Sequence, residues 1–260
     1  MDELLARGHY ARKQLFSRSR LVAWSHGSRF ATARRLVAPH AGRRLLDYGC
    51  GDGTFLALVH DLFPVATGVD ADADQMAECA ARFAALPGLT FASTEALDTA
   101  DPANRYDVVV CMEVLEHCPD DLQSGVLDQL HRVSAADAAL VVSVPIEIGL
   151  SLAAKQLARG VAAWRGLSEY EDRERYRVSE FVRMLCARAE TSIPRVETTA
   201  EFRDGHTLRY TGHKGFNWRT LENRIRERFT LERRVCSPMP LAGPWLNSQV
   251  WFVGRKKQET

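Results

Sequence analysis

The chain between positions 45 and 54 reads Leu45-Leu46-Asp47-Tyr48-Gly49-Cys50-Gly51-Asp52-Gly53-Thr54. A hydrophobic run and an acidic residue precede three glycines at every second position, and a helical pattern begins at Thr54. Glycine turns the backbone sharply and lets it pass close to a ligand where a Cβ atom would collide. The stretch therefore predicts a strand, a ligand-binding turn and a helix, in that order.

Strand and helix patterns alternate on both sides of this turn, which is typical of a doubly wound α/β sheet. Helices are expected at 54–62, 74–85, 122–133, 149–164 and 218–229. Strands are expected at 44–48, 66–69, 89–93, 106–111, 138–144, 231–236 and 249–253. We predict a Rossmann-like, doubly wound, seven-stranded sheet with its last strand antiparallel, and a helical lid insertion between the fifth and sixth strands.

Composition excludes several other classes of protein. Of 260 residues, 46% are hydrophobic and 26% charged, which is normal for a globular protein and unlike a disordered or fibrous one. A net charge of +1 gives no overall basic field for nucleic acid or membranes. The six cysteines form no CxxC pair, so neither a disulfide framework nor a thiolate zinc site is indicated. Since no membrane span or signal peptide is evident, we expect a cytoplasmic protein.

The glycine turn also indicates what it binds. A dinucleotide fingerprint would be GxGxxG, whereas Gly53 comes one residue early and Asp47 precedes the turn. A carboxylate there disfavours an anionic pyrophosphate and suits a cationic amino-acid group, such as the one in S-adenosylmethionine. Asp70 closes the second predicted strand, where an acid can accept hydrogen bonds from both ribose hydroxyls. Together the two acids predict one bound molecule of S-adenosylmethionine.

Three stretches carry a family resemblance: Leu46-Asp47-x-Gly49-Cys50-Gly51-x-Gly53, Gly68-Val69-Asp70 and Tyr106-Asp107-Val108-Val109-Val110-Cys111-Met112-Glu113-Val114-Leu115-Glu116-His117. They resemble class I methyltransferases, and most of all the ubiquinone-biosynthesis O-methyltransferase type. The likeness covers residues 44–144 well and the last forty residues loosely. The segment between these parts is not matched.

The resemblance implies which residues contact S-adenosylmethionine. They are Asp47, Gly49, Cys50, Gly51, Gly53, Asp70, Ala71, Ser93, Thr94 and Cys111. Among them, the glycine turn would hold the methionine moiety, Asp70 the ribose, and Ala71 with the turn at 93–94 the adenine edge. The carbonyl of Cys111 would approach the donor's amino group. Many relatives have aspartate in place of Ser93, so adenine recognition here would depend on serine, backbone or water.

Glu113, Glu116 and His117 have i, i+3, i+4 spacing, which on a short helix puts them on one face. Two carboxylates and an imidazole can bind Mg²⁺ or Mn²⁺, and the ion would acidify an acceptor hydroxyl. Some relatives hold a metal on such a turn, including quinone O-methyltransferases and enzymes that 2′-O-methylate the 3′ end of small RNAs. The RNA enzymes add a later histidine, and His213 is the candidate here. The metal hypothesis thus names Glu113, Glu116, His117 and His213.

Other interpretations of these residues stay open. Without a metal, His117 is the first candidate for general base, because an unperturbed imidazole titrates near neutrality and transfer to oxygen requires loss of a proton. The candidate catalytic residues are His117, His213 and Glu113. In a purely structural role, the glutamates would cap helices or pair with arginines, and His117 would pack under the lid.

These assignments divide the chain into four segments. Residues 1–43 form an N-terminal helical arm, 44–146 the S-adenosylmethionine-binding core, 147–212 the lid or substrate insertion, and 213–260 the C-terminal part of the core sheet. In the insertion, Lys155 and Arg159 interrupt an apolar helix, a pattern that fits peripheral contact with a membrane as well as a lid packed on the core.

The sequence favours a small-molecule acceptor. We predict S-adenosylmethionine-dependent O-methylation of a small or lipophilic hydroxylated metabolite. Metal-dependent 2′-O-methylation of an RNA 3′ end is one alternative; it is favoured by His213 and the basic N-terminal arm, and opposed by the near-neutral net charge. A non-catalytic S-adenosylmethionine-binding subunit is the other.

Overall fold

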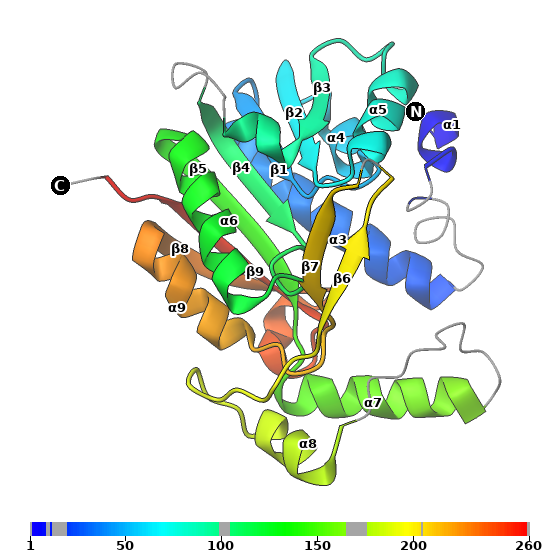
Figure 1. Cartoon of the computed structure of the whole chain (residues 1–260), viewed down its shortest axis with the longest axis vertical. Coiled ribbons are helices and arrows are strands. Elements are labelled where there is room, and N and C mark those ends of the chain that lie inside the picture. The colour runs from blue at the N-terminus through cyan, green and yellow to red at the C-terminus, as the bar shows by residue number, and fades with distance from the viewer. Residues whose placement is uncertain are drawn as a thin grey trace.

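The computed structural model describes residues 2–8, 11, 20–98, 105–164, 176–203 and 205–258. Residues 1, 9–10 and 12–19 of the predicted arm and residues 165–175 and 204 of the predicted insertion lie outside these ranges. Its centre is a seven-stranded sheet in the order β3-β2-β1-β4-β5-β9-β8 (Figure 1). The strands of this sheet are β1 (Arg44–Tyr48), β2 (Val65–Asp70), β3 (Leu89–Ser93), β4 (Tyr106–Met112), β5 (Ser134–Pro145), β8 (Phe229–Ser237) and β9 (Gln249–Lys256).

The strand directions match the predicted topology. The five strands from β1 to β5 pair in parallel, whereas β9 is antiparallel to both β5 and β8. The prediction of a doubly wound sheet whose last strand is antiparallel is therefore confirmed. Because the parallel strands end at one edge, their carboxyl ends gather the loops that follow them.

Helices cover both faces of the sheet (Figure 1). They are α1 (Asp2–Ala6), α3 (Arg20–Val37), α4 (Thr54–Val59), α5 (Ala73–Arg82), α6 (Asp120–Val133), α7 (Gly149–Trp164), α8 (Val178–Leu185) and α9 (Trp218–Arg228). Short 3₁₀ helices lie at η1 (Ala38–His40), η2 (Thr94–Leu97) and η4 (Pro240–Trp245).

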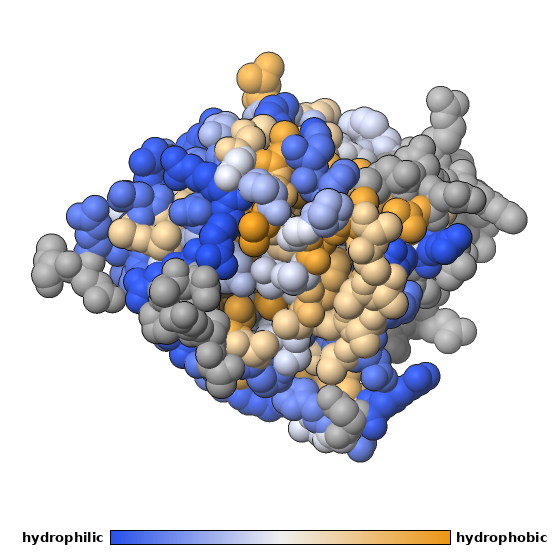
Figure 2. Space-filling model, turned by 90° about the horizontal axis from the view of Figure 1, so that it is seen from above, coloured by the Kyte–Doolittle hydropathy of each residue, from blue (hydrophilic) through white to orange (hydrophobic). Residues whose placement is uncertain are grey.

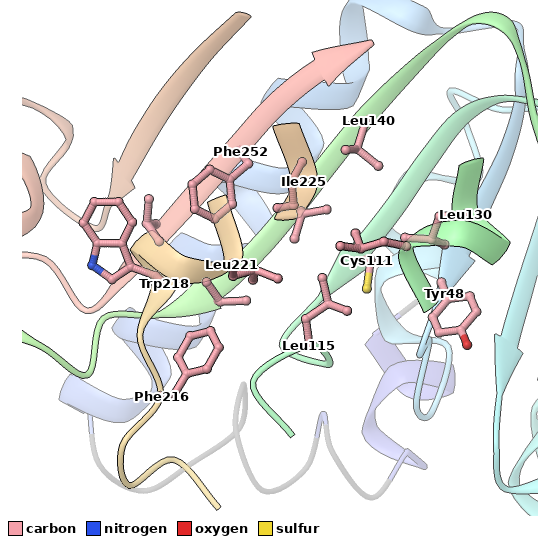
Figure 3. Packing of buried hydrophobic residues seen from close by; sticks show 14 of the residues in the cluster. Tyr48, Cys111, Leu115, Leu130, Leu140, Phe216, Trp218, Leu221, Ile225 and Phe252 are labelled. Atoms are coloured by element: carbon pink, nitrogen blue, oxygen red, sulfur yellow. The ribbon is translucent and has the colours of Figure 1, made fainter. Parts of the chain in front are cut away.

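Alternation along the strands builds a separate core on each face. In β1, Leu46 packs into the cluster that includes residues of α6 and α9, whereas Leu45 packs into the cluster that includes residues of α3, α4 and α5. Figure 3 shows the first cluster, in which Trp218 and Ile225 of α9 lie beside Phe252 of β9. The central strands of the sheet are nearly continuous apolar runs, as expected for strands buried on both faces.

The insertion after β5 is less helical than predicted. It contains α7 and α8, but also a hairpin of β6 (Glu197–Glu201) and β7 (Thr207–Thr211), a region in which the sequence showed no period. Most hairpin residues are exposed, so the strands lack the alternating apolar face by which strands are found. In the sequence, the Asp204-Gly205 pair between the two strands is a typical hairpin-turn dipeptide and could have indicated the hairpin.

The surface is mixed in character. Seen from above, apolar side chains gather near the centre of the face and hydrophilic ones lie toward its rim (Figure 2). Among the described helices, none has both the length and the hydrophobicity needed to cross a bilayer. The six cysteines are all free thiols.

Candidate active site

The glycine turn leaves β1 in a left-handed conformation at Gly49, Gly51 and Gly53, with φ of 71°, 52° and 70°. The amides of Gly49 and Cys50 donate to the carbonyl of Val69 at 2.8 and 3.0 Å and fix the turn against β2. A Cβ atom at Gly49 would lie 2.2 Å from Val114 Cγ2, whereas one at Gly51 would meet no described atom within 4 Å. The turn is therefore closed on one side and open above Gly51.

Asp47 lies under this turn and is 1% exposed. Neither carboxylate oxygen has a hydrogen-bond partner among the described residues. Burial, with a smaller contribution from the negative charge of Asp70, raises the pKa of Asp47 to about 8. A buried, unpaired carboxylate fits a cation, so the residues present fit the ammonium group of S-adenosylmethionine.

Asp70 and Ser93 end adjacent strands and are paired in register. The carboxylate of Asp70 accepts hydrogen bonds from the amides of Gly51 at 3.0 Å and Asp72 at 3.3 Å, which orients it at the mouth of the turn. Burial raises its pKa and these amides oppose the shift. Thr94 follows Ser93 as the first residue of η2, and Cys111 pairs with Tyr48 in register. The predicted donor residues thus share the carboxyl edge of β1 to β4, and their roles stay predictions.

The loop after β4 differs from the expected short helix. Residues 113–118 form turns, and Glu113 adopts a left-handed φ of 57°. Its amide donates to the carbonyl of Ser143 at 2.9 Å, and its carboxylate accepts from Ser143 Oγ at 3.1 Å and lies 3.4 Å from Arg29 Nη2. Glu113 is therefore held by Ser143 and Arg29, and the structure does not bring it into one ligand group with Glu116 and His117.

The structure instead brings Glu116, His117 and His213 together. One ligand atom of each lies within 4.8 Å of the others, and the two imidazole centroids are 4.8 Å apart. His117 Nδ1 lies 3.1 Å from the carbonyl of Thr211. Since a carbonyl only accepts, Nδ1 carries the proton and Nε2 keeps its lone pair. Burial and the neighbouring His213 lower the pKa of His117, which favours this neutral form.

Glu116 has no exposed surface, and neither of its carboxylate oxygens has a hydrogen-bond partner among the described residues. Burial, together with the negative charge of Glu113, raises its pKa well above the usual range. His117 Nε2 is 4.0 Å from Glu116 Oε1. A carboxylate and two imidazoles in this arrangement fit a divalent cation, and without one they can hold and move a proton.

Several residues of the site were missed from the sequence. Glu147 is buried, and its Oε1 lies 2.8 Å from Lys155 Nζ and 3.5 Å from His213 Nδ1, so it orients His213. Arg195 donates to the carbonyls of Glu116, Cys118 and Gly212 and so joins the two loops of the cluster. Glu147 comes three residues after the predicted strand 138–144, near the ligand-binding edge of the sheet, and this position could have identified it. Arg195 lies in a stretch without a pattern.

Substitution of Gly51 with alanine is expected to weaken S-adenosylmethionine binding at least tenfold, because the added Cβ projects into the open side of the turn. The left-handed φ costs about 1–2 kcal/mol of stability. Gly42→Ala is the matched control, since Gly42 also has a positive φ, of 83°, and open surroundings, but lies before β1. Calorimetric titration with the donor would measure the affinity of each variant. Equal losses of affinity in the two variants would mean that the turn does not contact the donor.

The chain is similar in sequence to known methyltransferases. A family model described as a methyltransferase domain matches residues 22–189. The ubiquinone biosynthesis O-methyltransferase of Albidiferax ferrireducens is 40% identical over 88 residues, which cover 32% of this chain and 34% of that protein. The enzyme of the same name from Haemophilus ducreyi is 38% identical over 88 residues, covering 31% and 37%. The chain thus matches about a third of the length of these curated relatives, and the resemblance to them is confirmed.

Solved structures show the same fold. The N-methyltransferase NodS from Bradyrhizobium japonicum superposes with a TM-score of 0.53 at 15% identity, over 90% of this chain and 97% of that one. The methyltransferase domain of bacterial CtHen1-C gives a TM-score of 0.56 at 13% identity, over 90% and 99%. At such low identity these likenesses support the architecture alone.

Proposed function

The chain belongs to the methyltransferase domain family, and from this premise we propose that it is an S-adenosylmethionine-dependent O-methyltransferase acting on a small or lipophilic hydroxylated metabolite. The observation that supports transfer to oxygen is the group Glu116, His117 and His213, which can take a proton from a hydroxyl. The loop that carries Glu116 and His117 packs against the glycine turn, because Val114 Cγ2 of this loop occupies the space that a Cβ atom at Gly49 would need.

The donor supplies a methyl group on a sulfonium, and transfer is an in-line displacement in which the new oxygen–carbon bond forms as the carbon–sulfur bond breaks. The chain's own residues have to align the acceptor and remove its proton. His117 suits the second task, because its Nε2 carries a lone pair while Thr211 holds Nδ1–H. Asp47 and the glycine turn would keep the donor's amino acid in place.

In the alternative arrangement, a divalent cation binds the same residues, takes up the lone pair of His117 Nε2, and would itself make the acceptor hydroxyl more acidic. Glu116, His117 and His213 would hold it, and Glu147 would fix the orientation of His213 from behind. The buried, unpartnered carboxylate of Glu116 supports this arrangement, because such a group gains most from a cation.

Methylation of an RNA 3′ end is a second candidate function. The proximity of His213 to Glu116 and His117 favours it, since a later histidine is the feature that the RNA enzymes add to the motif. The near-neutral net charge opposes it.

Incubation with methyl-labelled S-adenosylmethionine and cell extract is expected to place label in the organic-extractable or polar-metabolite fraction. EDTA should leave this labelling unchanged if His117 is the proton acceptor, whereas a loss of at least tenfold that Mg²⁺ or Mn²⁺ restores would establish the cation in its place. Boiled protein sets the background. Label confined to RNA and abolished by EDTA would establish the second candidate function instead. An absence of protein-dependent label in every fraction would favour a donor-binding subunit.

A further inference from the structure

The loop between β8 and β9 exposes four large apolar side chains within eight residues. Leu241 is fully exposed, and Leu246, Trp245 and Met239 are 64%, 55% and 45% exposed. Single exposed apolar residues are ordinary, whereas a cluster of this kind marks a contact surface. Residues 239–246 are called the apolar tip below.

Several polar groups of the tip's backbone are hydrogen-bonded from its inner side. Asn247, which is 2% exposed, accepts from the amide of Met239 at 2.6 Å and donates to the carbonyls of Met239 and Gly243 at 2.7 and 2.6 Å. Ser151 of α7 donates to the carbonyls of Pro244 and Trp245, at 2.7 and 3.0 Å. These groups would keep their hydrogen bonds if water around the tip were replaced by lipid, which lowers the cost of placing the tip in the interface of a bilayer.

The apolar surface continues onto the insertion. Leu150 and Leu157 of α7 are 53% and 71% exposed, and Ser151 ties this helix to the tip. Figure 1 shows α7 and α8 together at one end of the molecule. The surface therefore includes two segments that are far apart in the sequence.

Positive charge lies directly behind the tip. A cavity of about 210 Å³ is lined by Leu150, Leu185, Trp245 and other apolar residues, and by Arg188 and Arg219. No acidic side chain is among its described lining residues. Of the acids nearby, Glu147 is paired with Lys155, and Glu180 with Lys214. This charge distribution complements the phosphates of anionic lipids.

From these contacts we infer that the apolar tip docks the protein on an anionic phospholipid bilayer. Leu241, Trp245 and Leu246 enter the interfacial region, where a tryptophan ring is well suited, and lipid phosphates lie against Arg188 and Arg219. Docking turns the carboxyl edge of the sheet toward the membrane, because the tip lies just before Gln249, which pairs with Pro145 at the carboxyl end of β5. The inference goes beyond the proposed function and needs none of its chemistry.

Co-sedimentation with vesicles tests the inference directly. The full chain is mixed with vesicles of phosphatidylcholine alone or with added phosphatidylglycerol, and the bound fraction is measured. We expect binding to the anionic vesicles, a loss of at least about tenfold in the L241S/W245S double variant, and a weaker preference for anionic lipid in Arg188→Gln. Val65→Ser is the matched control, because Val65 is 38% exposed at the amino end of β2, the opposite edge of the sheet; its binding should be unchanged.

Three outcomes would overturn the inference. The first is no binding of the unsubstituted chain, and the second is equal binding of the double variant. The third is a double variant that changes sedimentation mass from dimer to monomer with no vesicle binding in either form, which would make the tip an interface between copies. Circular dichroism and donor titration on the same samples show that each variant is folded. Methyl transfer is measured separately without vesicles, so docking and the proposed function can fail independently.

Discussion

Replacing His117 with alanine is expected to lower kcat by about 100- to 10,000-fold, while the Kd for S-adenosylmethionine changes by less than about threefold. The imidazole contacts Thr211, Glu116 and His213 rather than the glycine turn, so its loss removes the proton acceptor and leaves the donor site intact. Single-turnover transfer of labelled methyl and calorimetric titration of the donor measure the two quantities.

The pH dependence of kcat checks the same assignment. Burial and His213 lower the pKa of His117 below its usual 6.5, so the imidazole is unprotonated at neutral pH. The value of kcat should therefore fall only on the acid side, below pH 6.5, and the His117→Ala variant should not show this decrease at low pH. His206→Ala is the matched control, because His206 lies at the hairpin turn and contacts Glu95 outside the cluster. An equal loss of turnover in that variant would contradict the role of His117.

The Asp47→Asn substitution is expected to act in opposite directions on ligand binding and on stability. It should weaken donor binding about ten- to hundredfold, because the ammonium group loses a charged partner. It should also stabilise the ligand-free protein at pH 8, on the order of 3–5 kcal/mol, because a buried, unpaired carboxylate is removed. Urea unfolding at pH 5 and pH 8, with and without donor, measures both effects.

The sign of the pH effect follows from the raised pKa of Asp47. Between its usual 3.8 and about 8, the folded state binds the proton and the unfolded state releases it, so stability falls as pH rises through this window. Glu116 contributes a pH dependence of stability with the same sign, since burial also raises its pKa. The Asp47→Asn variant keeps this contribution from Glu116. Asp61→Asn, at an exposed pair with Arg34, should not alter the slope. An unchanged slope in Asp47→Asn would contradict the assignment.

The sequence predicted the sheet and the donor turn because both depend on local chemistry. The apolar runs of β1 to β5 need no partner to be recognised, and the glycines of the turn are required by backbone geometry at Gly49, where Val114 leaves no room for a Cβ atom. The pairing of Glu116 and His117 with His213 was predicted through the family resemblance.

The remaining features depend on contacts between distant segments. Glu113 was expected beside Glu116 on a helix, but its bonds to Ser143 and Arg29 place it in a left-handed turn. No local pattern indicates such partners. The β6–β7 hairpin was missed for a related reason: its exposed strands are held by backbone pairing to each other, and Thr211 is bonded to His117 across the insertion.

The contact between Thr211 and His117 links the insertion to the proposed proton acceptor. The amide of Thr211 donates to the carbonyl of His117, and the ring of His117 donates to the carbonyl of Thr211, so β7 and the loop of residues 113–118 order each other. Opening of the insertion would move His213 away from Glu116 and would free His117 from its hydrogen bonds with Thr211, while the seven-stranded sheet stays folded. Amide exchange at Thr211 should therefore report the fraction of molecules competent for catalysis, independently of global unfolding.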